Sequence, residues 1–201
     1  TDLANENNST YVAWNFKAGG AAVSNTDGTI TSQVSANVEA GFSIVKFTGN
    51  GVSGATIGHS LGDTPKIIIG KSLGAGTNWL VQFPTVIGAG SSLVLNTTIA
   101  TVAPGSGQSD RWTTTLPTSS VFSIGGSTEL NDSGVSVIAY CFAEVEGFSS
   151  FGSYVGTGAS GNTIVTGFEP AFVMVKAYNT TSDWFIVDNK RNLTDPRNSN
   201  L

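Results

Sequence analysis

The side chains that could carry covalent or acid–base chemistry are few in this sequence. Its 201 residues include one cysteine, Cys141, and one histidine, His59. Cys141 lies in the apolar run 137–142, which is typical of a buried thiol rather than of an activated nucleophile. A serine-hydrolase triad would have to use His59 as its only base. We therefore predict no catalytic residues and no enzymatic activity.

Cofactor and metal sites are not indicated either. The stretches 49–54 and 156–161 share the G-x-G-x-x-G spacing of dinucleotide-binding loops, but strand-like Thr-Ile pairs follow both. Because that fingerprint needs a helix that faces the pyrophosphate, we interpret both stretches as hairpin turns. A single histidine without a cluster of further ligands predicts no metal site. Most of the 14 acidic residues fall in loops, and Glu144 and Glu146 alternate at the end of a predicted strand.

Aromatic side chains remain as candidates for ligand contact. Trp79 and Trp184 occupy equivalent positions in two similar stretches, described below, which favours a core or interface role. Trp112 lies in the unrepeated stretch 84–130. Since loops on a rigid scaffold often carry function, Trp112 is the single candidate ligand-contact residue.

The composition excludes several classes of function. Charged residues make up only 11% of the chain, compared with roughly 25% in ordinary soluble domains. A net charge of −5 with nine Lys and Arg residues does not supply the basic surface that nucleic acid requires. No apolar run approaches the ~18 residues of a membrane span. One cysteine excludes an intrachain disulfide framework.

The elements that position these residues are predicted to be strands. Val, Ile, Thr and Phe dominate, Gly recurs every few residues, and the Asp27-Gly28 pair is a strong hairpin signal. Many short strands between turn signals indicate an all-β fold, an antiparallel β-sandwich or a barrel-like domain. The predicted strands are 10–17, 28–34, 42–48, 55–58, 66–72, 78–83, 91–96, 111–115, 121–124, 135–143, 153–155, 163–165, 171–178 and 183–187.

An internal repeat is the most informative feature of the chain. Residues 48–57 (TGNGVSGATI) align with 155–164 (VGTGASGNTI) at an offset of 107 residues. Further on, the offset becomes 105 residues, and it pairs Pro65 with Pro170, Lys71 with Lys176, and Trp79 with Trp184.

The repeat predicts two unequal units. We expect a first β unit over 1–145 and a second, partial copy over 146–201. Residues 12–16 (VAWNF) also resemble 138–142 (IAYCF) at an offset of 126 residues, so 11–17 is the candidate closing strand of a preceding unit. We therefore expect that this sequence is a segment of a longer polypeptide that contains an array of such units.

Several segments resemble a repeat domain found in tail-fibre and structural proteins of marine phages. The resemblance rests on Val12–Gly20 (VAWNFKAGG), Gly41–Gly51 (GFSIVKFTGNG), Gly58–Lys66 (GHSLGDTPK), Gly167–Pro170 (GFEP) and Asp183–Asp188 (DWFIVD). It covers roughly two thirds of the chain. The sequence departs from the family pattern at Gly70, where a bulkier β-branched residue is typical. The resemblance implies a location on the virion and no defined catalytic residues.

These observations predict a structural or adhesive module of a phage tail fibre or similar surface appendage. We expect it to act in host attachment and to form a homo-oligomer, with a trimer as the candidate, because continuous apolar strands need cover. Other virion proteins and a host-surface glycan are the expected further partners. Two alternatives stay open: a lectin-like glycan-binding domain and, less favoured, a glycan depolymerase that uses paired carboxylates.

Overall fold

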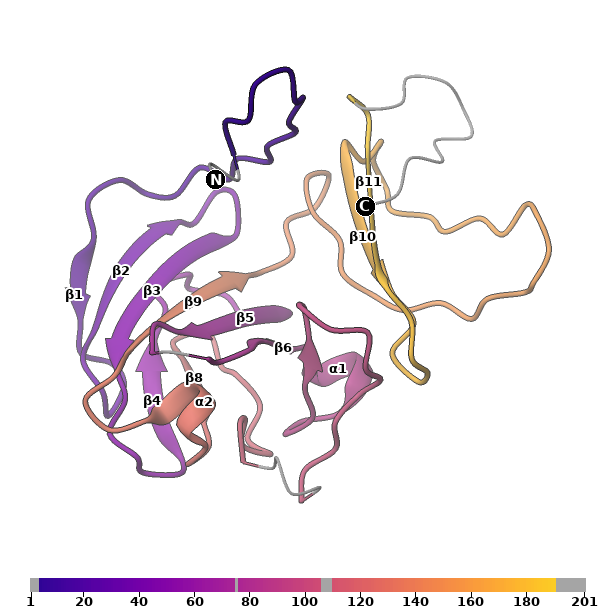
Figure 1. Cartoon of the computed structure of the whole chain (residues 1–201). Helices are drawn as coiled ribbons and strands as arrows, with labels where there is room; N and C mark the ends of the chain where they lie inside the picture. Colours follow the sequence, from indigo (N-terminus) through magenta and orange to yellow (C-terminus); the bar gives the residue numbers. More distant parts are fainter. Residues whose placement is uncertain (1–3, 75, 106–109, 191–201) are drawn as a thin grey trace.

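The computed structural model of the chain describes residues 4–74, 76–105 and 110–190 (Figure 1). These described residues form eleven strands and two four-residue helices. Every pairing between the named strands is antiparallel. The predicted all-β class is therefore confirmed.

The largest element is a seven-stranded sheet in which a late strand occupies the centre. Its order is β1 (Val23–Asn25), β2 (Ser32–Asn37), β3 (Phe42–Thr48), β9 (Ser136–Phe142), β5 (Ile67–Ser72), β6 (Trp79–Gln82) and β7 (Leu93–Val94). Strand β9 pairs with β3 on one side and with β5 on the other. The central strand thus joins two parts of the sheet that lie far apart from it in sequence.

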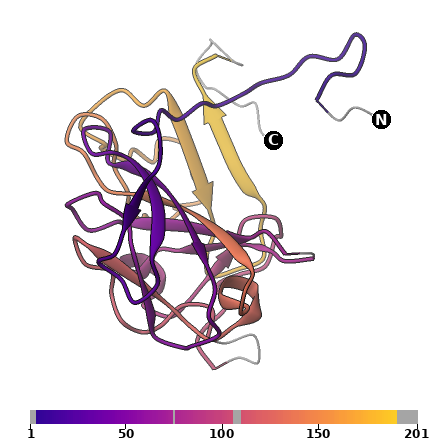
Figure 2. The same cartoon turned by 90° about the vertical axis from the view of Figure 1, so that its left-hand side faces the viewer.

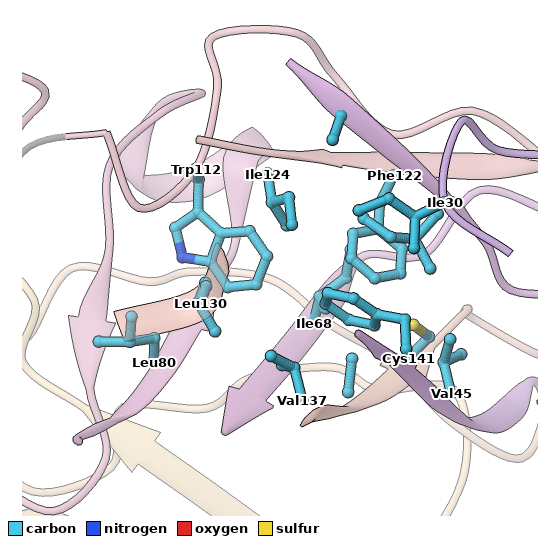
Figure 3. Packing of buried hydrophobic residues seen from close by; sticks show 14 of the residues in the cluster. Ile30, Val45, Ile68, Leu80, Trp112, Phe122, Ile124, Leu130, Val137 and Cys141 are labelled. Carbon is cyan, nitrogen blue, oxygen red and sulfur yellow. The ribbon is translucent and has the colours of Figure 1, made fainter. Parts of the chain in front are cut away.

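A smaller sheet of β4 (Ala55–Gly58) and β8 (Val121–Ile124) forms the second layer. Side chains from both sheets belong to one buried cluster. Figure 3 shows Phe122 and Ile124 of β8 facing Val45 and Cys141 of the larger sheet. The first part of the chain is therefore a β-sandwich with a narrow second layer.

Strand β9 shows the alternation expected of a strand with two different faces. Val137, Ala139 and Cys141 are buried in the core, whereas Tyr140 and Phe142 on the opposite face are half-buried. Burial raises the pKa of the Cys141 thiol to about 12, against a smaller lowering by Ser43. The thiol is therefore a protonated core group, as the apolar run around it predicted.

Two short helices connect the strands, α1 (Pro84–Ile87) and α2 (Thr128–Asn131). Helix α2 packs on β5 and explains the glycine at position 70. A Cβ atom at Gly70 would lie 2.7 Å from Leu130 Cδ2 and 3.3 Å from the Trp112 ring. The space that a β-branched residue would fill is thus already occupied by two core side chains.

Four predicted strands do not form: 10–17, 111–115, 153–155 and 163–165. In the second of these, Trp112 makes only an isolated bridge with Ile124. The residue types in all four favour strands, but a strand is stable only beside a partner that satisfies its backbone groups. Those predictions were wrong because the sequence pattern does not show which partner is present.

The last two strands, β10 (Phe172–Lys176) and β11 (Trp184–Asp188), form a separate hairpin. Figures 1 and 2 show this hairpin beside the sandwich rather than within it. It contacts β7 and the segment that follows it, and Trp184 Nε1 donates to the carbonyl of Val94 in β7 at 3.1 Å. The backbone N–H of Thr101 also donates to the Tyr178 carbonyl at 2.8 Å.

Candidate assembly surface

Trp112, the candidate ligand-contact residue, lies in the core. Its side chain is 2% exposed and packs at an angle on Phe122, with ring centroids 6.5 Å apart. Trp112 is among the residues that line a shallow hollow, together with Ser53, Asp110 and Thr114. A sugar would need an open ring face for stacking, and this ring does not present one. Ligand contact by Trp112 stays a prediction, and the geometry favours a packing role.

His59 is followed by Ser60, and the sequence prediction did not use the glycines around this pair. Gly58, Ser60 and Gly62 have the G-x-S-x-G spacing of a nucleophile elbow, and Ser60 has the positive φ, 57°, that such elbows favour. The elbow also needs a helix after the serine, and bends follow β4 here. The Ser60 Oγ accepts a hydrogen bond from Asn25 Nδ2 at 3.0 Å rather than contacting the histidine.

Both nitrogens of the His59 ring are engaged by the backbone. Nε2 lies 3.2 Å from the Thr118 carbonyl oxygen, and Leu61 N–H donates to Nδ1 at 3.3 Å. The ring is fully buried. An imidazole held this way cannot accept a proton from Ser60, so its contacts are structural.

The first glycine-rich stretch is a turn that Asn131 holds. The Asn131 Oδ1 accepts hydrogen bonds from the N–H groups of Asn50 at 2.8 Å and Gly51 at 3.2 Å. Its Nδ2 donates to the Val52 and Gly125 carbonyls. Because strand β4 follows the turn, the requirement for a phosphate-binding helix is not met. The hairpin-turn prediction was wrong for this stretch, because the turn joins β3 to β4, which lie in different sheets and do not pair with each other.

Metal ligands do not converge in the described ranges 4–74, 76–105 and 110–190. Within them, no group of three His, Cys, Asp or Glu side chains is placed to hold a metal ion. Glu144 and Glu146 are both exposed after β9, as the alternation predicted. The Glu144 carboxylate accepts a hydrogen bond from the Phe151 N–H at 2.9 Å.

The hairpin β10–β11 reproduces the geometry of β5–β6. Lys71 lies opposite Trp79 in the first hairpin, and Lys176 lies opposite Trp184 in the second. In each hairpin the lysine Nζ donates to a carbonyl oxygen six residues further on, at 2.6 Å: Thr77 in the first and Ser182 in the second. All these positions are 105 residues apart, so the repeat extends to strand register and loop contact. A whole second unit remains a prediction, and residues 191–201 lie outside the described part of the chain.

The two hairpins differ in what covers them. In the first, Ile68 and Leu80 face the core and are both fully buried. Their counterparts, Val173 and Phe185, are 38% and 37% exposed. The face that the second layer covers in the first hairpin is therefore open to solvent in the second.

Aromatic residues of the N-terminal segment extend this exposed region. Trp14 Nε1 donates to Asp188 Oδ2 at 3.3 Å, and its ring lies 5.9 Å from that of Phe172. Phe16, which is 54% exposed, has three ring neighbours: Phe42 at 5.7 Å, Phe142 at 5.8 Å and Phe172 at 6.1 Å. We call the β10–β11 hairpin together with residues 12–16 the assembly surface.

Comparison with known proteins places the chain in a family. A family model for a domain of unknown function, DUF7483, matches residues 1–201. The chain belongs to the DUF7483 family. No curated protein and no solved structure matches it.

The DUF7483 description names no activity or ligand. The resemblance to phage tail-fibre repeat domains therefore stays a prediction. In the described part of this DUF7483 chain, no helix has both the length and the apolar character that a membrane span needs. The assembly surface, with its exposed apolar side chains, is the feature of the chain that bears most directly on its function.

The buried histidine makes the stability of this DUF7483 chain depend on pH. Burial lowers the His59 pKa from its ordinary value, and the Thr118 carbonyl and Asp27 oppose the shift less strongly. Below about pH 6.5 the unfolded chain binds a proton that the folded ring resists, so stability falls as pH falls. We expect chemical denaturation to give a lower free energy of unfolding at about pH 5.5 than at about pH 7.5.

The matched variant for this measurement is His59→Gln. It removes the titrating ring, so its stability should change less over the same pH interval, whatever its absolute stability. Equal pH slopes for the two proteins would show that His59 does not contribute to the dependence.

Proposed function

We propose that this DUF7483 chain is a non-enzymatic structural or adhesive module that assembles into homo-oligomers through its β-strands, as part of a phage tail fibre or a similar appendage on the virion surface. The observation that carries the proposal is the exposed apolar face of β10–β11. The resemblance to tail-fibre repeat domains supports the virion location.

The energetic argument follows from the repeat. Val173 and Phe185 occupy positions whose counterparts are fully buried, and both keep more than a third of their surface in water. Complete burial of an exposed side chain of this type contributes about 1.5–3 kcal/mol, so covering the remaining exposed third contributes roughly 0.5–1 kcal/mol for each residue. A face built like a core strand but left in solvent is characteristic of a surface that a partner covers.

The two most reactive side-chain types support a structural module rather than an enzyme. The His59 ring is occupied by two backbone groups, and the Cys141 thiol is fully buried with a raised pKa. Both side chains are buried in the interior of the sandwich. The low fraction of charged residues suits a surface covered by neighbouring subunits.

The proposal predicts that Val173→Asp weakens self-association. A charge on this face would have to be desolvated on assembly, so the dissociation constant for self-association should rise by at least about tenfold. Sedimentation equilibrium of the full chain over a range of concentrations measures it. The matched control is Val165→Asp, because Val165 is 88% exposed and lies outside the hairpin.

Two results would count against the proposal. The first is a wild-type chain that stays monomeric at every concentration. The second is equal association of the Val173→Asp and Val165→Asp variants. Thermal unfolding of both variants shows whether each is folded.

A further inference from the structure

The hairpin β10–β11 has an open edge where its counterpart has a neighbouring strand. In the seven-stranded sheet, β5 lies between β6 and β9. Strand β10 corresponds to β5, but in the described part of the chain it pairs only with β11. An edge strand with unpaired backbone groups is a template for another strand.

The chain contains a second sequence of the β9 type. Residues 12–16 read VAWNF and residues 138–142 of β9 read IAYCF, with an alanine and a phenylalanine shared at equivalent positions and an aromatic residue between them. Residues 12–16 form no strand. They carry the residue types of a central strand without the pairing.

The repeat also fixes the register in which this segment would fit. Ile67 lies opposite Phe142 in the first sheet. The offset of 105 residues relates Ile67 to Phe172, and the offset of 126 residues relates Phe142 to Phe16. The same register would therefore place Phe172 opposite Phe16. These two rings are already in contact within the chain, with centroids 6.1 Å apart. The proposed pairing is therefore continuous with an existing contact.

Within its own chain the segment crosses the end of the hairpin instead of running along β10. Trp14 contacts Phe172 and Asp188, whereas the β9 register would place it opposite Met174. The following residues are fixed to β2, because the Lys17 carbonyl accepts a hydrogen bond from Asn37 and the Gly20 carbonyl one from Ser35. Figure 2 shows the chain before this anchor extending away from the sandwich as an arm.

We propose that residues 11–17 of one copy add as an antiparallel strand to the open edge of β10 in a second copy, with Phe16 opposite Phe172. Strand addition of this kind gives affinity through main-chain hydrogen bonds and specificity through alternate side chains. The inference rests on the proposed function and names the partner: another copy of this chain.

The experiment mixes two variants that each carry one introduced cysteine and a different mass tag. In the proposed register Ala13 lies opposite Val175, so Ala13→Cys and Val175→Cys should form a mixed disulfide under mild oxidation. Native Cys141 can stay, because it is buried with a raised pKa. Because the cysteines are on separate chains, intact mass under non-reducing conditions detects only bonds between copies.

The matched control replaces Val175→Cys by Val173→Cys. Val173 is the more exposed position but lies two residues out of register with Ala13. Random collision would favour this control, whereas strand addition favours the Val175 pair by about tenfold. Comparable yields from the two pairs would overturn the inference.

Two further results separate this inference from the proposed function. If the double variant Ala13→Cys/Val175→Cys closes within one chain and the mixture gives no mixed disulfide, the arm pairs with its own hairpin and the inference is wrong. If sedimentation shows oligomers but neither mixture cross-links in register, the chain assembles by another contact, which leaves the proposed function standing. A chain that is monomeric and does not cross-link would refute both.

Discussion

Replacing Trp112 with alanine is expected to lower the free energy of unfolding by about 3–5 kcal/mol. The indole is 2% exposed and packs on Phe122 beneath β8. It also lies against Gly70 of β5, which has no side chain of its own to fill the space left by the ring. Chemical denaturation followed by circular dichroism measures the loss.

Two further variants make this result specific. Trp112→Phe keeps most of the ring volume. It also removes an indole N–H that has no hydrogen-bond partner in the described part of the chain, so the free energy of unfolding should fall much less than in Trp112→Ala. Leu116→Ala removes an apolar side chain that is 56% exposed and should change stability little. A Trp112→Ala variant as stable as Leu116→Ala would contradict the packing role and return Trp112 to the candidates for ligand contact.

The second large effect is expected at the buried ion pair between Arg111 and Glu129. Arg111 is 2% exposed, and its Nε donates to Glu129 Oε2 while its Nη1 donates to Ser92 Oγ at 3.2 Å. Glu129→Gln keeps the shape but leaves the buried guanidinium without the charge it faces. We expect the free energy of unfolding to fall by about 3 kcal/mol. This is the lower end of the range for a broken buried ion pair, because Glu129 is partly exposed.

The control for this variant is Glu39→Gln, which removes a carboxylate from an exposed position. The double variant Arg111→Met/Glu129→Gln should be more stable than Glu129→Gln alone, because it also removes the buried guanidinium that faces the lost carboxylate. Denaturant midpoints compare the four proteins. Equal midpoints for Glu129→Gln and Glu39→Gln would show that the pair contributes little.

Much of the fold followed from the sequence because the central strands carry strong patterns. The run 135–143 became β9, and the strands expected at 66–72, 78–83, 171–178 and 183–187 formed as β5, β6, β10 and β11. Strand type depends on local residue preference and alternation, which a sequence displays directly. The partner of each strand depends on distant residues, and for that reason 10–17 was predicted as a strand although none forms there.

The candidate site was less predictable for the same physical reason. Trp112 was a reasonable contact residue because it lies in the unrepeated stretch 84–130, next to a predicted loop. Its burial follows from Leu130 and Gly70, which lie on different elements and meet it only in the folded chain. The exposure of Val173 and Phe185 could not be predicted from the sequence either, because both lie in apolar stretches typical of a buried strand. The positive φ of Ser60 could have been suspected from its G-x-S-x-G spacing.

The lysine contact shared by the two hairpins restricts how their loops can evolve. Lys71 and Lys176 each reach a carbonyl six residues ahead. An insertion or deletion in either loop would carry that oxygen out of range and leave an ammonium group without its acceptor. These loops should therefore tolerate substitutions but not insertions or deletions. Among related domains, the length of each loop should vary less than its sequence.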